Sequence, residues 1–435
     1  MKTEELYKLF LKHPSVSTDS RKTSPGSIFF ALRGERFDGN QFAAQAIGAG
    51  AVKAVIDDPA AGEGPEYIPV EDALLTLQEL AAYHRSRLGI PVMAVTGSNG
   101  KTTTKDLIAA CLSAGLRTAS TRGNLNNHIG VPLSLLELND RHEIGIIEMG
   151  ASHRGEIARL CEIASPDYGL ITNIGKAHLE GFGSQEGVRM AKGELYTYLG
   201  SRQKTIFVNG GDELLVEMAA VGNAQLVCYG DADQACVRGR VLGADPLLSL
   251  ELTYRSGGVT DKLVVNTRVF GTYNLDNYLA AACVAEHFSI DRKAVKKALE
   301  GYTPDNMRSQ LVEKGTNLVV LDSYNANPDS MKAAIDDFAR LDHPQKVLIL
   351  GDMLELGDRS PEEHAGLLQH IGRHRFSAVY LTGSNFTRAG VPDEYLAFTT
   401  TGELAAHLQA HPLRDATILV KGSRLLALEE VLSSL

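Results

Sequence analysis

A glycine-rich segment at residues 96–104 has the residue types and spacing of a loop that holds phosphate groups. It reads Thr-Gly-Ser-Asn-Gly-Lys-Thr-Thr-Thr, follows a predicted strand at 92–96 and opens a predicted helix at 102–115. Glycine lets the backbone approach a phosphate closely, and the free N–H groups of a helix start face the anion. Val95 stands where the longer pattern has glycine, so the match is the shorter G-x-x-G-K-T. A turn without a ligand is the alternative, but a lysine and three threonines directly after it favour phosphate binding. The predicted phosphate-binding residues are Gly97, Ser98, Asn99, Gly100, Lys101, Thr102 and Thr103.

Three further polar residues follow later predicted strands, at the sheet edge where ligands bind in open α/β folds. They are Glu148, His178 and Lys192. Each alone is more often structural: a strand-end glutamate forms salt bridges, a loop histidine hydrogen-bonds its surroundings, and a helix lysine is solvated. Their shared position favours a Mg²⁺ site, because Mg²⁺ prefers oxygen ligands and keeps some waters. Glu148 and the hydroxyl of Thr102 suit the ion directly, whereas His178 suits it less well and could act through water.

Apolar strands alternate with helices along most of the chain, which predicts mostly parallel sheets with helices on both faces. Residues 224–270 break this alternation and predict an antiparallel appendage, and Gly301-Tyr302-Thr303-Pro304 marks a boundary. The predicted strands are 28–32, 54–56, 92–96, 144–149, 168–174, 205–208, 248–254, 263–270, 318–321, 347–350, 378–381 and 418–420. The predicted helices are 72–88, 102–115, 155–163, 186–199, 274–288 and 292–299. We therefore expect an α/β protein of three domains: a small α/β domain at 1–88, a central P-loop-type domain at 89–302 and a Rossmann-like α/β domain at 303–435.

Composition excludes several classes of protein. The 435 residues are too many for one hydrophobic core. A net charge of −10 disfavours general nucleic-acid binding. No apolar run is long enough for a membrane helix, and the N-terminus does not resemble a signal peptide. Five scattered cysteines argue against both a disulfide framework and a zinc site, and they fit a reducing cytoplasm. We expect a cytoplasmic protein, and a monomer is compatible with these features.

Over its whole length the chain resembles the Mur ligases, ATP-dependent enzymes of peptidoglycan precursor synthesis. The residues that carry the resemblance are 96–102, Glu148, His178, 191–194, 271–277, Arg308, Asp322 and 421–424. Within the family, the chain is most similar to the members that add D-alanyl-D-alanine. The segments that carry this closer resemblance are 19–21, 29–39, 123–133, 322–328 and 350–357.

The resemblance implies a role for each matching residue. Lys101, His178, Lys192 and Arg308 would be catalytic. Asn274 and Asn277 would lie on the adenine side of ATP, Arg308 at its phosphates and Asp322 at its ribose. Tyr273 departs from the histidine common in the family, which affects the local nucleotide contact. The implied metal ligands are Thr102 and Glu148 for one Mg²⁺, and His178 with a carbamylated Lys192 for a second. Carbamylation has a rationale, since a free ammonium cannot ligate a cation whereas its CO₂ adduct is an anionic oxygen ligand.

The resemblance also implies the substrates and their contacts. Ser20, Arg21, Arg33 and Asp38 would bind the uridine nucleotide, and Asn124, Asn126 and Asn127 the muramyl peptide. Asn325 and Asn327 would hold the incoming dipeptide, although bonding to their own turn explains them equally well. The implied reaction joins D-alanyl-D-alanine to UDP-N-acetylmuramoyl-tripeptide through an acyl phosphate, releasing ADP and phosphate. The alternatives are addition of the third peptide residue, a folate-type polyglutamylating ligase, and a P-loop switch that forms no bond.

Overall fold

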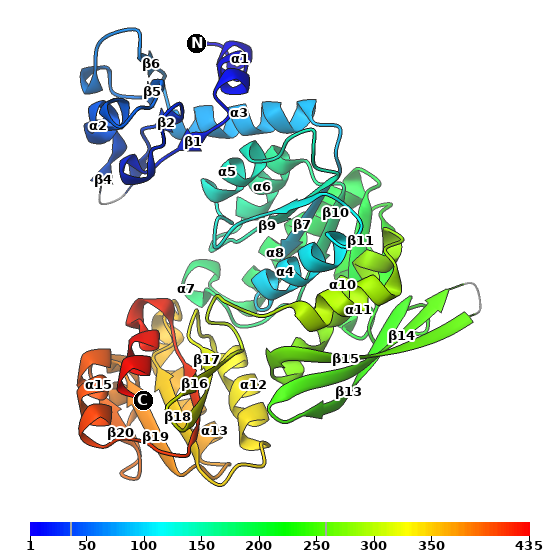
Figure 1. Cartoon of the computed structure of the whole chain (residues 1–435), viewed down its shortest axis with the longest axis vertical. Coiled ribbons are helices and arrows are strands. Elements are labelled where there is room, and N and C mark those ends of the chain that lie inside the picture. Colours follow the sequence, from blue (N-terminus) through cyan, green and yellow to red (C-terminus); the bar gives the residue numbers. More distant parts are fainter. Residues whose placement is uncertain (35–36, 257–258) are drawn as a thin grey trace.

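Three sheets rich in parallel strands follow one another along the chain, each covered by helices (Figure 1). The computed structural model describes residues 1–34, 37–256 and 259–435. Residues 35–36, within the resembling segment 29–39, and residues 257–258, within the predicted antiparallel stretch, lie outside the described residues. The three sheets confirm the expected α/β fold of three domains.

The N-terminal sheet is small and wholly parallel, with the strand order β1-β2-β5-β6. Its strands are β1 (Val16–Ser17), β2 (Ile28–Phe30), β5 (Lys53–Ile56) and β6 (Tyr67–Pro69), and its helices are α1 (Thr3–Lys12), α2 (Ala43–Gly48) and α3 (Ala73–Arg87). A two-stranded hairpin joins β3 (Arg33–Gly34) and β4 (Phe37–Asp38). Asp72 caps α3 by accepting from the N–H of Leu75. This helix was predicted at 72–88, and its residues Leu77, Leu80 and Ala81 are buried.

The central sheet has nine strands in the order β15-β14-β13-β12-β11-β10-β7-β9-β8. Its strands are β7 (Val92–Thr96), β8 (Thr118–Ser120), β9 (Ile144–Glu148), β10 (Tyr168–Ile171), β11 (Thr205–Asn209), β12 (Gln225–Tyr229), β13 (Val237–Ala244), β14 (Leu247–Ser256) and β15 (Val259–Phe270). Its helices are α4 (Lys101–Leu112), α5 (Gly130–Leu136), α6 (Glu156–Ala164), α7 (Leu179–Phe182), α8 (Gln185–Ser201), α9 (Glu213–Ala219), the 3₁₀ turn η4 (Thr272–Asn274), α10 (Leu275–His287) and α11 (Arg292–Gly301).

Helices cover both faces of this sheet because successive strand residues point to opposite sides. Along β7, Met93 and Val95 belong to one apolar cluster with residues of α4, α10 and α11. Val92 and Ala94 belong to another cluster with residues of α6 and α8. A strand buried on both faces has an uninterrupted run of apolar residues, and this pattern allowed β7 to be predicted from the sequence.

The segment at 224–270 corrects one prediction. It is not a separate antiparallel appendage, because β12 pairs in parallel with β11 and extends the central sheet. The antiparallel pairing begins only with β13–β14 and continues with β14–β15. The predicted strand at 168–174 is also shorter, since β10 ends at Ile171 and the following residues turn to support the phosphate loop.

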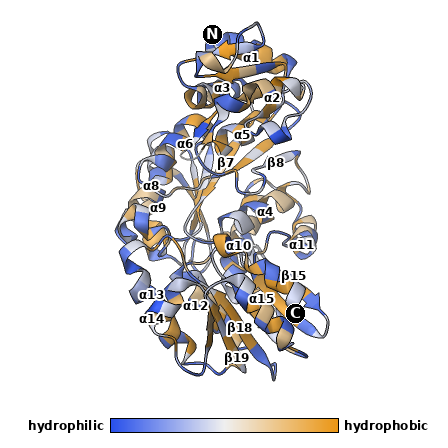
Figure 2. Ribbon diagram, turned by 90° about the vertical axis from the view of Figure 1, so that its left-hand side faces the viewer, coloured by the Kyte–Doolittle hydropathy of each residue, from blue (hydrophilic) through white to orange (hydrophobic). Residues whose placement is uncertain are grey.

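The C-terminal sheet has the order β16-β17-β21-β18-β19-β20, parallel except where β16 pairs with β17. Its strands are β16 (Gln310–Lys314), β17 (Asn317–Asp322), β18 (Lys346–Gly351), β19 (Ala378–Thr382), β20 (Leu396–Phe398) and β21 (Thr417–Lys421). Its helices are α12 (Pro328–Ala339), α13 (Ser360–Ile371), α14 (Ser384–Ala389) and α15 (Thr401–Ala410), with the 3₁₀ turns η5 (Gly357–Arg359), η6 (Arg424–Leu426) and η7 (Leu428–Ser434). Apolar residues gather on strands such as β18 and β19, inside the helical layers (Figure 2). Throughout the described part of the chain, every helix is too short or too polar to cross a membrane.

Candidate functional site

One cavity of about 1080 Å³ is lined by residues of all three domains. Leu74 and Gln78 reach it from α3, the phosphate loop lines it from the central domain, and the segment after β17 lines it from the C-terminal domain. The predicted site residues on its wall are Ser98, Asn99, Gly100, Lys101, Thr103, Asn124, Asn126, Asn127, Glu148, His178, Asn274, Asn277, Arg308, Asp322, Asn325 and Asn327. Gly97, Thr102 and Lys192 are not among its lining residues, and Thr102 and Lys192 are buried.

The phosphate loop connects β7 to α4 in a shape that only glycine tolerates at two positions. Gly97 has φ +143° and Gly100 has φ +77°. A Cβ at Gly97 would lie 2.0 Å from the hydroxyl oxygen of Thr172, and one at Gly100 would lie 2.7 Å from the amide oxygen of Asn277. The first turn of α4 begins at Lys101, so its free N–H groups point toward the loop.

The residues that follow β10 hold this loop in place. The hydroxyl of Thr172 donates to the carbonyl of Asn99 (2.6 Å), and the side-chain oxygen of Asn173 accepts from the N–H of Asn99 (2.9 Å). Gly175 N–H donates to the hydroxyl of Ser98 (2.9 Å). The loop conformation is therefore fixed by side chains more than seventy residues away.

Lys101 turns back over its own loop. Its ammonium donates to the carbonyls of Gly97 (2.8 Å) and Ser98 (3.1 Å). The pKa of Lys101 is lowered to about 8, mainly because the ammonium is buried; Glu148 opposes the shift and the nearby charge of Arg308 contributes to it. Two cations converging on one site favour an anionic ligand.

Glu148 lies at the carboxyl end of β9 and is 1% exposed. Its Oε1 accepts a hydrogen bond from the side-chain amide of Asn126 at 2.7 Å, while its Oε2 is buried without a hydrogen-bond partner. A buried carboxylate oxygen without a partner is costly, and a cation would compensate it. The donor set therefore fits a bound Mg²⁺, with Glu148 as a direct ligand.

Lys192 lies on α8 beneath the cavity and is 1% exposed. Its ammonium donates to the carbonyl of Ala151 (3.3 Å) and lies 5.4 Å from the centre of the Phe182 ring. Burial lowers the pKa of Lys192 to about 7, helped by the positive charge of Lys101, although Glu156, Glu194 and Glu148 oppose the shift. A substantial fraction of this amine is therefore neutral near pH 7, which is the form that reacts with CO₂.

His178 starts α7 with φ +50°, and its Nδ1 lies 2.8 Å from Oε2 of Glu355 in the C-terminal domain. The hydrogen bond from His178 lowers the pKa of the Glu355 carboxyl, although burial opposes the shift. Glu355 lies in the segment 350–357, which carries part of the family resemblance, but no role was predicted for Glu355 itself.

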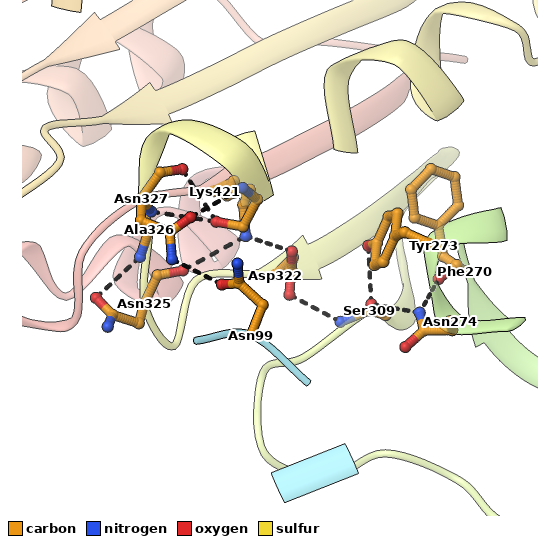
Figure 3. A network of polar contacts seen from close by, with 11 residues as sticks. Asn99, Phe270, Tyr273, Asn274, Ser309, Asp322, Asn325, Ala326, Asn327 and Lys421 are labelled. Atoms are coloured by element: carbon orange, nitrogen blue, oxygen red, sulfur yellow. Dashed lines mark hydrogen bonds and ion pairs between the residues drawn. The ribbon is translucent and has the colours of Figure 1, made fainter. Parts of the chain in front are cut away.

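The residues predicted on the nucleotide side form a chain of hydrogen bonds (Figure 3). The Asn274 side-chain amide donates to the Phe270 carbonyl (2.8 Å) and to the Ser309 hydroxyl (3.2 Å). The Asn277 side chain donates to Asn274 (2.8 Å) and accepts from the Thr104 hydroxyl (2.9 Å). Tyr273, which departs from the family histidine, lies 2.9 Å from the Ser309 hydroxyl. These asparagines therefore brace the wall of the cavity as well as lining it.

Arg308 and Asp322 lie where the C-terminal domain begins. The Arg308 guanidinium stacks 4.0 Å from the Tyr324 ring centre, and its Nε is buried without a partner. The Asp322 carboxylate accepts from the Ser309 N–H (3.1 Å) and from the ammonium of Lys421 (2.5 Å), as Figure 3 shows. Both oxygens of Asp322 therefore have protein donors.

Asn325 and Asn327 have different local partners. Asn325 accepts from the N–H of Ala326 (2.9 Å), which is the bond to its own turn that the sequence left open. Asn327 caps α12 by accepting from the N–H of Ser330 (2.9 Å), and its amide also donates to the side chain of Asn99 (2.7 Å). Asn327 thus links the phosphate loop to the C-terminal domain.

The muramyl-peptide prediction covers three asparagines between β8 and α5. The N–H of Asn126 donates to the carbonyl of Asn124 (2.8 Å), and Asn127 accepts from the N–H groups of Ile129 and Gly130 at the start of α5. All three line the cavity, but Asn126 and Asn127 are also committed to protein partners.

The four residues predicted to bind the uridine nucleotide do not line this cavity. Arg21 pairs with Asp19 (2.9 Å), and Ser20 donates to the side chain of Gln45 (3.3 Å). Arg33 donates to Asp57 (2.9 Å) and lies opposite Asp38 in the β3–β4 hairpin. All four belong to the N-terminal domain and lie outside the wall of the cavity.

Several polar residues that join the central and C-terminal domains were not predicted. The backbone N–H of Lys176 donates to Asp329 (2.7 Å), and its ammonium pairs with Glu363 (2.6 Å). Asp337 accepts from the N–H and hydroxyl of Thr272. Asp329 directly follows the segment 322–328, and Lys176 lies two residues before His178; this proximity was the signal that the sequence offered.

Comparison with known protein families matches three consecutive models. The Mur ligase family catalytic domain matches residues 14–85, the Mur ligase middle domain matches 95–285, and the Mur ligase glutamate ligase domain matches 307–424. Together they cover all three sheets.

Individual relatives are similar over nearly the whole chain. The UDP-N-acetylmuramoyl-tripeptide–D-alanyl-D-alanine ligase of Bacillus subtilis is 36% identical over 97% of this chain and 92% of its own length. A crystal structure of MurF from Acinetobacter baumannii superposes with a TM-score of 0.87 at 30% identity, covering 99% of this chain and 98% of that one. The MurF ligase of Thermotoga maritima in complex with ADP gives a TM-score of 0.83 at 26% identity, covering 98% and 97%. The chain belongs to the Mur ligase family.

Proposed function

We propose that this protein is an ATP-dependent ligase that joins D-alanyl-D-alanine to UDP-N-acetylmuramoyl-tripeptide in peptidoglycan precursor synthesis. The observation that carries the proposal is the shared cavity, in which Asn327 of the segment 322–328 contacts Asn99 of the phosphate loop. This contact brings the segment most similar to the D-alanyl-D-alanine-adding members next to the site for ATP. The similarity to relatives of that name extends over the whole chain.

The binding of ATP is supported by the geometry of the phosphate loop and by the positively charged side chains of Lys101 and Arg308. The loop amides and Lys101 would hold the phosphates, and Arg308 would approach them from the C-terminal domain. Asn274 and Asn277 would contact the adenine side, and Asp322 the ribose. For Asp322 this requires its carboxylate to share its existing partners, Ser309 and Lys421, with the ligand.

Thr102 and Glu148 would hold one Mg²⁺, which supplies charge neutralisation and alignment of the phosphate oxygens. His178 and a carbamylated Lys192 would hold a second. The unpartnered oxygen of Glu148 supports the first site, and the buried Lys192 with its lowered pKa supports the modification.

In the proposed mechanism the muramyl-peptide carboxylate attacks the γ-phosphate of ATP, forming an acyl phosphate and ADP. Lys101 and Arg308 stabilise the charge that gathers on the transferring phosphoryl group. The amine of the dipeptide then attacks the acyl carbon, the amide bond forms and phosphate leaves. Asn325 and Asn327 position the dipeptide, and the C-terminal domain excludes water from the acyl phosphate.

We divide the chain into domains at 1–88, 89–302 and 303–435, with separate roles. The N-terminal domain binds the uridine nucleotide through Ser20, Arg21, Arg33 and Asp38, and Asn124, Asn126 and Asn127 contact the peptide. The C-terminal domain closes on the nucleotide. Because one chain supplies every side of the cavity, a monomer suffices, and the nucleotide-linked substrates place the reaction in the cytoplasm.

The experiment that tests this function follows phosphate release with ATP and Mg²⁺ while each co-substrate is omitted in turn. Release that requires both UDP-N-acetylmuramoyl-tripeptide and D-alanyl-D-alanine, with a product heavier by the dipeptide residue, supports the proposal. Release with the UDP-linked dipeptide and a diamino acid would assign the preceding step. Turnover indifferent to every amine would refute a ligase and favour a nucleotide switch.

A further inference from the structure

Away from the cavity, three potential metal ligands converge where α12 and α13 pack against each other. Nε2 of His370 lies 2.8 Å from Oδ1 of Asp336, and Nε2 of His374 lies 2.9 Å from the same oxygen. The three ligand atoms all lie within 4.8 Å of one another. Asp336 belongs to α12, His370 to the last turn of α13, and His374 to the turn that follows.

The chemistry of this set fits a zinc-class cation. Two imidazole nitrogens and one carboxylate oxygen are a common three-ligand set for Zn²⁺, leaving the fourth position to water. With metal–ligand bonds of about 2.0–2.1 Å, tetrahedral ligand atoms lie roughly 3.3 Å apart, so each nitrogen–oxygen distance must open by about half an ångström.

The two imidazoles are already oriented. They are four residues apart along the chain, their ring centres lie 5.4 Å apart, and their planes are inclined by 71°. The ring of His374 also packs 6.1 Å from Phe376, which stacks on Phe338 of α12. The aromatic contacts therefore limit the positions that His374 can adopt.

The site is accessible, and its surroundings favour a soft cation. The side chains of Asp336, His370 and His374 retain 36%, 14% and 26% exposure, which leaves a path for an ion. Arg373 and Arg375 flank His374 in the sequence. Their positive charge opposes any divalent cation, so affinity must come from the two imidazoles, which suit Zn²⁺ better than Mg²⁺.

An ion here would link α12 to α13, two helices that contact the central domain. At their other ends, Asp329 of α12 accepts from the N–H of Lys176, and Glu363 of α13 pairs with the ammonium of the same lysine. The angle between the helices therefore affects both contacts to Lys176. The sequence argument against zinc rested on the cysteines, and this cluster contains none.

We propose that Asp336, His370 and His374 form a binding site for a zinc-class divalent cation that fastens α12 to α13. The competing explanation is a hydrogen-bonded trio in which Asp336 accepts from both histidines. If the three residues bind a cation, replacing Asp336 with asparagine should weaken metal binding. If they form only a hydrogen-bonded trio, the same replacement should leave metal binding unchanged.

The test is calorimetric titration of the full-length protein with Zn²⁺, in excess Mg²⁺ to occupy oxygen-rich sites. The variants are Asp336→Asn and His370→Ala. The matched control is His407→Ala, because His407 and His411 are also four residues apart with stacked rings at 4.4 Å, yet belong to no such three-ligand cluster in the described part of the chain. Co²⁺ provides a second probe through its ligand-field absorption.

We expect the wild-type protein and the His407→Ala variant to bind one Zn²⁺ that the Asp336→Asn and His370→Ala variants do not bind, or that those two variants bind at least tenfold more weakly. Zinc should raise the melting temperature of the first pair only, and the same pair should give a tetrahedral Co²⁺ spectrum. Circular dichroism without metal checks that the variants fold. Equal zinc stoichiometry and affinity in all four proteins would overturn the proposal, since the ion would then bind elsewhere, for example at thiols.

Discussion

The structure gives Asn126 a second role beside the peptide contact proposed for it, and this second role is testable. Its side-chain amide holds Oε1 of Glu148 at 2.7 Å, while the other oxygen, Oε2, has no hydrogen-bond partner among the described residues. If Glu148 binds Mg²⁺, Asn126 acts as a positioning residue that aims the free oxygen. Replacing Asn126 with alanine should therefore weaken the metal site.

The size of the effect follows from the bond that is lost. A hydrogen bond to a charged group contributes about 1.5–3 kcal/mol, and roughly 1.4 kcal/mol corresponds to a factor of ten. Partners of metal ligands typically change metal affinity by roughly 10–100-fold. We expect Asn126→Ala to raise the Mg²⁺ concentration for half-maximal activity by about one to two orders of magnitude.

The assay measures initial rates of phosphate release against Mg²⁺ concentration, with all three substrates saturating. The matched control is Asn127→Ala, since Asn127 accepts from two N–H groups at the start of α5 and, within the described residues, makes no hydrogen bond to Glu148. It should leave the Mg²⁺ dependence unchanged. A raised KM for the muramyl peptide with an unchanged Mg²⁺ dependence in Asn126→Ala would refute the positioning role and support direct substrate contact.

Three other predictions concern Lys192, Asn327 and Lys421. Burial lowers the pKa of Lys192 to about 7, so after an acid pulse the enzyme should regain activity as CO₂ adds to the neutral amine, at a rate that rises through pH 7 and then levels off at constant dissolved CO₂. A recovery rate still rising toward pH 10 would contradict this. The Lys192→Arg variant should stay inactive. Asn327→Ser should keep the helix cap but lose the contact to Asn99, lowering kcat at nearly unchanged stability, whereas Asn327→Ala should also cost about 1 kcal/mol in urea unfolding. Lys421→Met should cost roughly 3–5 kcal/mol by leaving buried Asp322 unpaired, and adding Asp322→Asn should restore part of that loss.

The fold was largely predictable because each buried parallel strand leaves a local signature. The strands β7 and β9 are largely apolar up to their last residues, Thr96 and Glu148, and both are buried along their whole length. Some helices begin at recognisable caps, such as Asp72 before α3. The strand β12 was not predicted, although four of its five residues are apolar, and its first two residues, Gln225 and Leu226, are exposed. Its assignment to the sheet depends on its register with β11, which is a long-range property.

Those parts of the site that depend on residues close together in the sequence were predictable. The phosphate loop is local, so its glycines and Lys101 could be assigned from sequence alone. The partners that hold it, Thr172 and Asn173, act across more than seventy residues and carry no motif of their own. For the same reason nothing in the sequence distinguished Asn325, which bonds its own turn, from Asn327, which reaches the phosphate loop.

The contact between His178 and Glu355 connects domain arrangement to metal chemistry. The hydrogen bond from His178 lowers the pKa of Glu355, so this carboxyl is ionised at neutral pH and can only accept. Nδ1 of His178 must therefore donate the proton of this hydrogen bond, which fixes the orientation of the imidazole ring. Because Glu355 belongs to the C-terminal domain, opening that domain would break the bond and release the ring. The orientation of His178, a proposed metal ligand, therefore depends on how the C-terminal domain sits against the central domain.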